Sequence, residues 1–243
     1  MNPNGYQPTP QQPQWISAST AEMATRERTF IRSVYGWMFG GLLVTAFASL
    51  WVVLSPAMQQ LVLMNRAVTW GLFIAELGLV LAISAGLRRF SPATAASMFL
   101  VFSLLNGLSL SSIFFVYSGA SIMQAFVSAA AMFGAMSIYG LVTKRDLTSW
   151  GSFFLMGLFG IVICSVINFF LHSAAMAFAI SIIGVFVFIG LTAYDNQKLK
   201  AFATQSGPLQ ESLSIYGALM LYLDFINLFL FLLRIFGGSG RRR

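Results

Sequence analysis

Charged residues are scarce in this chain, and their scarcity excludes most classes of soluble protein. Only 9% of the 243 residues are Asp, Glu, Lys or Arg, whereas 58% are hydrophobic. A typical soluble domain has about a quarter of its residues charged. The single cysteine, Cys164, lies in an apolar run, so no disulfide framework or thiolate metal cluster can form within one chain. The composition therefore predicts an integral membrane protein.

The hydrophobic residues gather in seven stretches, each close to the length of about 20 residues that a transmembrane helix requires. These stretches are residues 34–54, 69–87, 96–117, 122–142, 151–171, 175–194 and 213–236. They predict an all-α polytopic membrane protein whose transmembrane domain covers residues 31–237. Residues 1–30 are rich in Pro, Gln, Asn, Ser and Thr and lack the apolar core of a signal peptide, so we expect a disordered cytoplasmic tail there. Residues 238–243 form a basic C-terminal tail.

Basic residues concentrate on one predicted side of the membrane. Nine of them precede the first stretch or lie in the loops that share its side, whereas the opposite loops carry only Arg66 and His172 before the last stretch. This bias places the N-terminus in the cytoplasm. It also accounts for the net charge of +7, so nucleic-acid binding is not indicated. If all seven stretches span the membrane, the basic residues 241–243 lie on the outer side, against this distribution of charge. A re-entrant last segment would instead place them on the cytoplasmic side. We favour the full span because residues 213–236 give about 36 Å of helix.

Three acids interrupt the hydrophobic stretches. Asp195 directly follows the sixth stretch, Asp224 lies inside the seventh, and Glu76 lies in the middle of the second. A carboxylate at membrane depth costs a few kcal/mol or more, so each acid is by default a functional-site hypothesis. Asp195 and Asp224, on successive helices, form a candidate dyad.

Helical spacing places each aspartate on a stripe that faces protein or water. In the seventh stretch, Asp224 aligns with Gly217, Asn227 and Arg234, with Phe231 interrupting the polar series. In the sixth, Asp195 aligns with Ser181, Phe188 and Thr192. If these two helices pack antiparallel, Asp195 approaches Asp224 only when the sixth helix continues beyond Tyr194.

Two carboxyl groups in one site of low dielectric have two chemical uses. Without a cation they cannot both ionise, so they share a proton and respond to pH. With a cation they supply at most four of the roughly six to eight oxygen ligands that Ca²⁺ takes, which makes a weak site suited to an ion in transit. No cofactor is indicated, and His172 is a lone loop residue unsuited to metal binding.

Structural roles for the same acids stay open. Asp195 could instead be an interfacial residue at the end of a helix. Asp224 could be a structural carboxyl group paired with a buried arginine or hydroxyl. Glu76 either lines the same cavity or forms hydrogen bonds with a neighbouring helix. We expect Asn106 and Asn168 to join helices. We also expect small residues at close spacing, such as those of Gly36-x-x-x-Gly40, to lie in helix contacts within the bundle.

Two C-terminal segments carry a family resemblance. Residues 190–200 (GLTAYDNQKLK) and 218–237 (ALMLYLDFINLFLFLLRIFG) strongly resemble the Bax inhibitor-1 family, the transmembrane Bax inhibitor motif proteins. Residues 139–147 (YGLVTKRDL) and 35–38 (YGWM) are similar to its bacterial members of the inner membrane. The resemblance covers nearly all of residues 26–237.

The resemblance implies a seven-helix bundle with the last helix at its centre, and a pH-sensitive Ca²⁺ leak gated by an aspartate dyad in the cell inner membrane. The dyad of the family matches Asp195, in the Tyr-Asp motif, and Asp224, in the Tyr-Leu-Asp-Phe motif. The intramembrane acid of its second helix is similar to Glu76. No cofactor is implied. Ca²⁺ is the transported ion, and Asp195 and Asp224 are the residues expected to bind it.

The chain departs from the family pattern at two positions. Some members carry an arginine on the second helix that contacts the dyad when the pore is closed. Leu87 falls at that position here and Arg88 follows it, so Arg88 is only a candidate for this contact. Asn196 stands where many relatives have Thr, and we expect little consequence.

Two other functions compete with the leak. An intramembrane aspartyl protease also uses two acids on successive helices, but the seventh stretch reads Leu-Tyr-Leu-Asp instead of Gly-x-Gly-Asp, and no Pro-Ala-Leu motif follows. We therefore expect no enzyme. The second alternative is a non-catalytic modulator of another membrane protein, such as a quality-control protease in a stress response. The expected partners are thus Ca²⁺, the lipid bilayer and, in the alternative, such a membrane protein.

Overall fold

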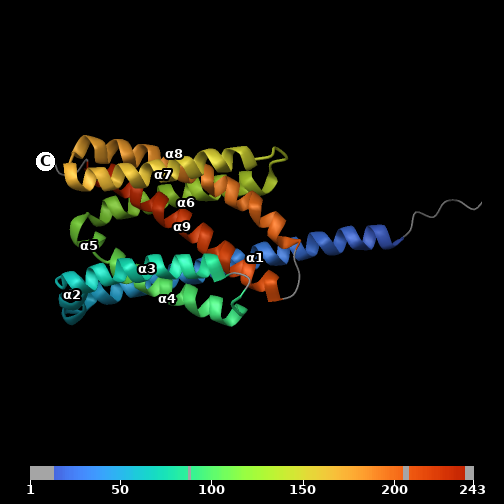
Figure 1. The fold of residues 1–243 in the computed structure, drawn as a ribbon, viewed down its shortest axis with the longest axis horizontal. Coiled ribbons are helices and arrows are strands. Elements are labelled where there is room, and N and C mark those ends of the chain that lie inside the picture. The colour runs from blue at the N-terminus through green and yellow to red at the C-terminus, as the bar shows by residue number, and fades with distance from the viewer. Residues whose placement is uncertain (1–13, 87–88, 205–207, 239–243) are drawn as a thin grey trace, which may run out of the picture.

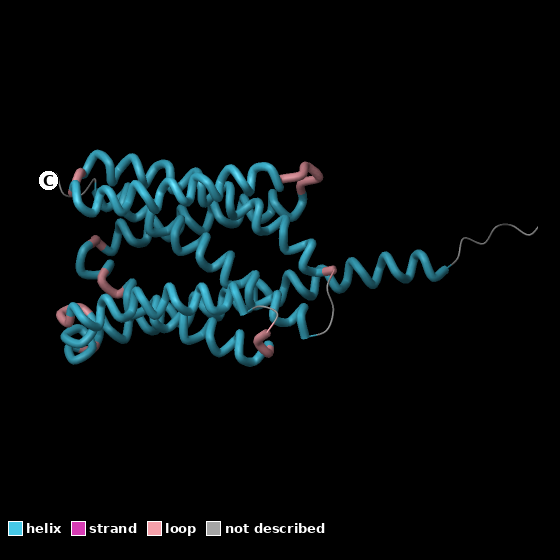
Figure 2. The backbone as a smooth tube through the Cα atoms, in the orientation of Figure 1, coloured by secondary structure: helices cyan, strands magenta, loops and turns pink. Residues whose placement is uncertain are grey.

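The computed structural model describes residues 14–86, 89–204 and 208–238, and these residues form helices and short loops without a strand. Figure 2 shows this helical backbone. The helices are α1 (Gln14–Leu54), α2 (Pro56–Val62), α3 (Arg66–Gly86), α4 (Pro92–Leu110), α5 (Ile113–Val116), α6 (Gly119–Val142), α7 (Thr148–Leu171), α8 (Ala174–Ala203) and α9 (Pro208–Gly238). Seven of these helices are long and apolar enough to cross a membrane, so the predicted all-α polytopic fold is confirmed.

Serine residues begin several of the helices. Ser55, Ser91, Ser118 and Ser173 each accept a hydrogen bond from a backbone N–H in the first turn that follows. Pro56 and Pro92 come directly after two of these caps, where the missing N–H of proline has no helical partner to lose. In a bilayer, backbone groups at helix ends have few other partners, so these caps fix where the loops begin.

The last helix lies at the centre of the bundle (Figure 1). α9 packs against α8, α6, α1, α4 and α3, whereas α7 packs mainly on α8. In the most apolar part of α9, 61% of residues are buried inside the protein, compared with 6% in α7. The expected central position of the last helix is therefore confirmed.

α9 is a single uninterrupted helix, and its part from Leu209 to Gly237 is long and apolar enough to span. The full span is thus favoured over the re-entrant alternative. The tail at residues 239–243, which includes the last three arginines, lies outside the described residues.

The predicted N-terminal tail is too long. α1 already begins at Gln14, so the expected disorder is wrong for residues 14–30, while residues 1–13 lie outside the described part of the chain. Residues 21–28 include Ala, Glu, Met and Arg, which are strong helix formers. Once a helix has formed, each residue that is added to it is fixed in exchange for one new hydrogen bond, so extension needs no new nucleation. These residues therefore prolong α1 beyond the bundle.

Close packing of helices occurs at glycines other than the expected pair. A Cβ atom added at Gly107 of α4 would meet the backbone carbonyl of Thr45 and lie 2.6 Å from Ala48 Cβ, both on α1. Gly36 and Gly40, by contrast, have no atom within 4 Å of such a Cβ position. The expected role of Gly36 and Gly40 in helix contacts within the bundle is therefore wrong, because the i, i+4 face that they share points away from the other helices.

Replacement by alanine should distinguish a glycine at a helix contact from a glycine without one. Gly107→Ala should lower the free energy of unfolding by about 1–3 kcal/mol, because the new methyl group would push α4 away from α1. Gly40→Ala, the matched control, should leave stability unchanged or raise it by up to about 1 kcal/mol, the gain in helix propensity. Unfolding in detergent micelles would measure both. Equal effects of the two changes would contradict the assigned contact.

Asn196 joins three helices within the core. Its side chain is fully buried. The hydroxyl of Tyr35 on α1 donates to Asn196 Oδ1 at 2.5 Å, and Asn196 Nδ2 donates to Ser137 Oγ of α6 at 3.1 Å and to the carbonyl of Thr192 at 2.7 Å. The departure from the family pattern at this position thus lies in a buried polar contact of α1, α6 and α8.

Asn196→Ala should destabilise the fold, because it removes a buried amide that accepts from the half-buried Tyr35 hydroxyl and donates to Ser137. We expect a loss of about 1–3 kcal/mol in the free energy of unfolding. Gln124→Ala, on an exposed face of α6, is the control and should have no measurable effect. Unfolding curves for the two variants in the same micelles test this expectation, and an Asn196→Ala protein as stable as the control would refute it.

Candidate functional site

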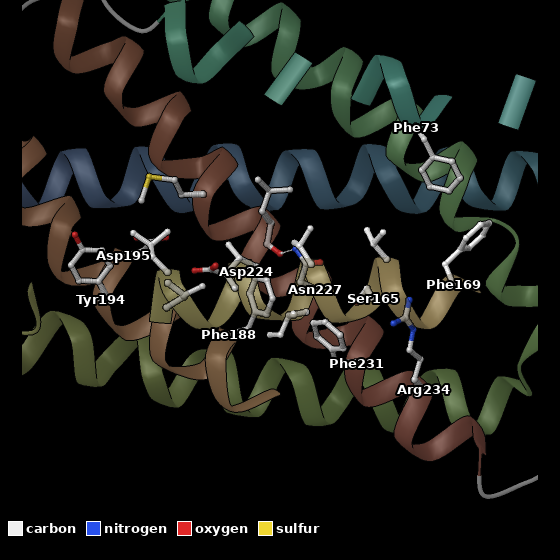
Figure 3. Close-up of a pocket in the computed structure, with 18 of the residues that line it drawn as sticks. Phe73, Ser165, Phe169, Phe188, Tyr194, Asp195, Asp224, Asn227, Phe231 and Arg234 are labelled. Atoms are coloured by element: carbon white, nitrogen blue, oxygen red, sulfur yellow. Dashed lines mark hydrogen bonds between the residues drawn. The ribbon is translucent and has the colours of Figure 1, made fainter. Parts of the chain in front are cut away.

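A cavity of about 980 Å³ lies between the two halves of the bundle. Residues of α8 and α9 line its floor, α7 lines one wall, and Trp70 and Phe73 of α3 line the other. Figure 3 shows Asp195 and Asp224 toward one end of this cavity and Arg234 at the opposite end. The structure therefore brings the two aspartates of the predicted dyad to one cavity.

The length of α8 makes this approach possible. The predicted sixth span ended at Tyr194, but α8 continues to Ala203 and packs along α9. Asp195 consequently sits within the helix rather than at its end. Tyr194 packs its ring over Gly151 of α7, where a Cβ atom would lie 2.5 Å from the ring carbons.

Asp224 is buried at the middle of α9, with 4% of its surface exposed. Its Oδ2 atom has no hydrogen-bond partner, and within the described part of the chain it is the sole buried side-chain oxygen or nitrogen of this kind. A buried polar atom without a partner costs about 1–3 kcal/mol. Pairing of Asp224 with a buried arginine or hydroxyl, the structural alternative, is absent among the described residues.

Asp195 is half-buried and lies close enough to Asp224 for the two carboxyl groups to interact electrostatically. Lys198, one turn further along α8, is the cation that acts on Asp195. Lys198 also lies 5.6 Å from the centre of the Phe202 ring. The negative charge of the aspartate pair can therefore be balanced by a bound proton, by Lys198 or by an added cation.

The predicted stripe on α9 is mostly confirmed. Asp224, Asn227, Phe231 and Arg234 all line the cavity, whereas Gly217 faces Leu199 and Val34 instead. On α8 the result is mixed, because Phe188 and Asp195 line the cavity and the other two positions do not. The hydroxyls of Ser181 and Thr192 donate to carbonyls one turn earlier in α8.

Several residues that line the cavity were not predicted from the sequence. Ser165 of α7, Tyr216 of α9 and Lys198 of α8 all line it. Lys198 was within reach of prediction, because it follows Asp195 at i+3 spacing. Ser165 carried no such signal, since its helix is hydrophobic on all sides and packs mainly on α8.

Glu76 lies in a separate polar network and not on the lining of the cavity. Ser109 Oγ donates to Glu76 Oε1 at 2.5 Å, and Asn106 Nδ2 donates to Glu76 Oε2 at 3.2 Å. Both donors come from α4. Of the two alternatives for Glu76, the structure therefore places it in hydrogen bonds with a neighbouring helix.

The network of Glu76 continues to the central helix. Tyr222 of α9 donates its hydroxyl to Asn106 Oδ1 at 2.9 Å and lies 2.6 Å from the hydroxyl of Thr45 on α1. Asn106 thus joins α3, α4 and α9, as expected of an asparagine that joins helices. Because Tyr222 precedes Asp224 by two residues, any rearrangement of this network acts on the same segment of α9.

The predicted basic contact of the dyad cannot be placed. Arg88, the candidate, and Leu87 lie outside the described residues.

His172 is exposed at the end of α7 with a φ of 53°. Residues 14–86, 89–204 and 208–238 contain no group of three or more His, Cys, Asp or Glu able to hold a metal ion. Asn168 Oδ1 accepts from the backbone N–H of Ser173 and so closes the loop between α7 and α8.

Comparison with known proteins finds a family match and several bacterial relatives. The family described as "Inhibitor of apoptosis-promoting Bax1" matches residues 27–241. The inner membrane protein YbhL of Escherichia coli K12 is 51% identical over 215 residues, which cover 87% of this chain and 92% of that protein. An uncharacterized protein of Deinococcus radiodurans is 41% identical over 230 residues, covering 94% and 97% of the two chains. A protein of Rickettsia prowazekii is 42% identical over 213 residues, covering 87% and 90%.

The family match covers six of the spans in full, most of the first span, and both aspartates of the cavity. Identities above 40% over nearly the whole length exclude a chance likeness of hydrophobic helices. This seven-span membrane protein belongs to the Bax inhibitor-1 family.

Proposed function

We propose that the protein is a pH-sensitive leak for cations, chiefly Ca²⁺, in which Asp195 and Asp224 bind the ion and respond to protons. The observation that carries this proposal is the position of Asp224. Its carboxyl group is buried near the middle of the spanning helix α9, lines the cavity, and has one oxygen without a partner. Acids retained at such a cost inside a membrane mark ion or proton pathways.

The chemistry of the cavity suits a hard cation in transit. Besides the two carboxyl groups, Asn227, Ser165 and Tyr216 offer side-chain oxygens along the same surface. A Ca²⁺ ion takes about six to eight oxygen ligands, so water would complete its shell. A site with only two anionic side chains binds weakly, and weak binding lets an ion leave as readily as it enters.

Proton binding to the aspartate pair gives the proposed switch. A proton on either carboxyl group removes the repulsion between them, and a proton on Asp195 also removes its attraction to Lys198. The helices α8 and α9 then have a different preferred spacing, and acid favours the open state. A difference of one pKa unit between the two states is worth about 1.4 kcal/mol, or roughly a tenfold change in the open population. A change of charge at Glu76 reaches α9 through Asn106 and Tyr222.

We also propose the orientation with the N-terminus in the cytoplasm of a cell inner membrane. The start of α1 and the connections α3–α4, α6–α7 and α8–α9 lie at one end of the bundle (Figure 1). The basic residues at this end include Arg26, Arg89, Lys144 and, in the last turn of α8, Lys200, whereas Arg66 and Arg234 belong to the opposite end. Such an excess marks the cytoplasmic side. The inner membrane itself is the location in the name of the E. coli relative.

Ca²⁺ flux into proteoliposomes over a pH series tests the leak. Wild-type protein should pass Ca²⁺ at a rate that rises roughly tenfold on acidification, as a switch of about one pKa unit requires. Asp195→Asn and Asp224→Asn should each remove most of this pH dependence, because the amide keeps the shape of the side chain but binds no proton.

Asp146→Asn provides the matched control. Asp146 is an exposed carboxylate between α6 and α7, outside the spans. The hydroxyl and the backbone N–H of Thr148 donate to it at 2.6 and 2.9 Å, and these hydrogen bonds lower the pKa of Asp146. It therefore stays ionised through mild acid, and its replacement should leave the pH profile unchanged. Flux no greater than that of empty liposomes would reject the leak and favour the role of a non-catalytic modulator.

Thiol labelling tests the orientation. In a Cys164→Ser background, Met64→Cys should react with a membrane-impermeant maleimide on intact spheroplasts, because its loop faces outward. Lys144→Cys should react only after the membrane is opened. Both positions are exposed in the structure, so a difference reports the side of the membrane. The reverse pattern would contradict the proposed orientation.

A further inference from the structure

We propose that the outer half of this cavity is a phospholipid site, in which one acyl chain lies along the apolar floor and Arg234 holds the phosphate. The site would prefer lipids whose headgroup carries a net negative charge. This proposal concerns binding alone and does not depend on whether the protein conducts ions.

The cavity is open sideways to the bilayer. Trp70 and Phe73 on its α3 wall are 55% and 53% exposed, and Val162 and Phe169 on its α7 wall are 52% and 63% exposed. Exposed apolar side chains at this depth face lipid rather than water. α3 packs on α4, and α7 packs on α8, so the two walls belong to different halves of the bundle. An acyl chain can therefore enter between them.

Arg234 supplies a cation at the end of the cavity. Its guanidinium lies 5.7 Å from the centre of the Phe231 ring, is exposed, and forms no ion pair within the described residues. The sequence has seven acids, and none lies at this end of the bundle. Glu76 and Asp224 lie at mid-height, and the other five lie toward the opposite end, namely Glu22, Glu27, Asp146, Asp195 and Glu211. No acidic side chain of the protein therefore complements Arg234, and a lipid phosphate has the charge that this end of the cavity lacks.

The dimensions of the cavity match one lipid leaflet. Ten residues of α9 separate Asp224 from Arg234, which is about 15 Å of helix and about half the thickness of the hydrocarbon core. A phosphate at Arg234 thus places the end of an acyl chain near the level of Asp224. Phe73 and Phe169 lie near the same end as Arg234 (Figure 3). Trp70, also on the lining, lies in the first turns of α3, and tryptophan is enriched at the level of the headgroups. Free phosphate would contact Arg234 but would gain nothing from the apolar floor.

Native mass spectrometry of the purified full-length protein tests this site by titration with dioleoyl-phosphatidylglycerol. One lipid should bind more tightly than the rest. Arg234→Gln should weaken that first binding roughly tenfold, the effect of losing one hydrogen bond to a charged group. Arg66→Gln is the matched control, because Arg66 is an exposed arginine at the same end but does not line the cavity. It should leave the first binding unchanged.

Two further arms test the acyl chain. Ser165→Trp should block the first binding by filling the middle of the cavity, whereas Ile163→Trp, on the outer face of the same helix, should not. Dihexanoyl-phosphatidylglycerol, which has the same headgroup on short chains, should bind more weakly than the dioleoyl lipid. Equal losses for the two arginine variants would overturn the proposal. Unchanged binding in Ser165→Trp, with Tm near that of the wild type, would overturn it as well.

Discussion

Because a bilayer offers no water to polar groups, each polar residue of α9 has to find a partner inside the bundle or face a cavity. α9 is enclosed by α1, α3, α4, α6 and α8, and the buried side chains of its centre form much of the core. Helices in lipid gain little from hydrophobic burial against one another, so close contacts and internal hydrogen bonds hold the bundle together. The glycine contact at Gly107 and the hydrogen bonds of Asn196 are examples of these two forces.

Two residues of the central helix divide the polar chemistry of the protein between opposite faces. Tyr222 and Asp224 are about 200° apart around the helix, since each residue turns it by about 100°. Tyr222 faces α1 and α4, where Thr45 and Asn106 satisfy its hydroxyl. Asp224 faces the cavity and keeps one oxygen without a partner. The satisfied face gives the helix a fixed position, and the unsatisfied face leaves a group free to bind a proton or a cation.

The two proposals use different parts of one cavity. Asp195, Lys198 and Tyr216 make its inner end polar, whereas the lining between Asp224 and Arg234 is mostly apolar, with Asn227 and Ser165 as polar residues. An ion from the inner end would meet the aspartate pair first. A lipid chain held from the outer end would cover the path beyond Asp224, so an ion that crosses the whole membrane would require the chain to move. Such competition would couple the lipid composition of the membrane to the leak.

The sequence by itself determined the elements of this protein and only part of their assembly. Seven hydrophobic stretches predicted seven spans, because a helix that crosses lipid satisfies its own backbone and needs no distant partner. The i, i+3 and i+7 spacing likewise predicted that Asp224, Asn227 and Arg234 share a face. Tertiary structure decided which partner each face meets. It placed Glu76 against Asn106 and Ser109, left Gly36 and Gly40 without a contact, and brought Ser165 to the cavity. Sequence spacing describes directions within one helix, whereas these outcomes depend on how two helices are rotated and shifted against each other, which packing over the whole bundle sets.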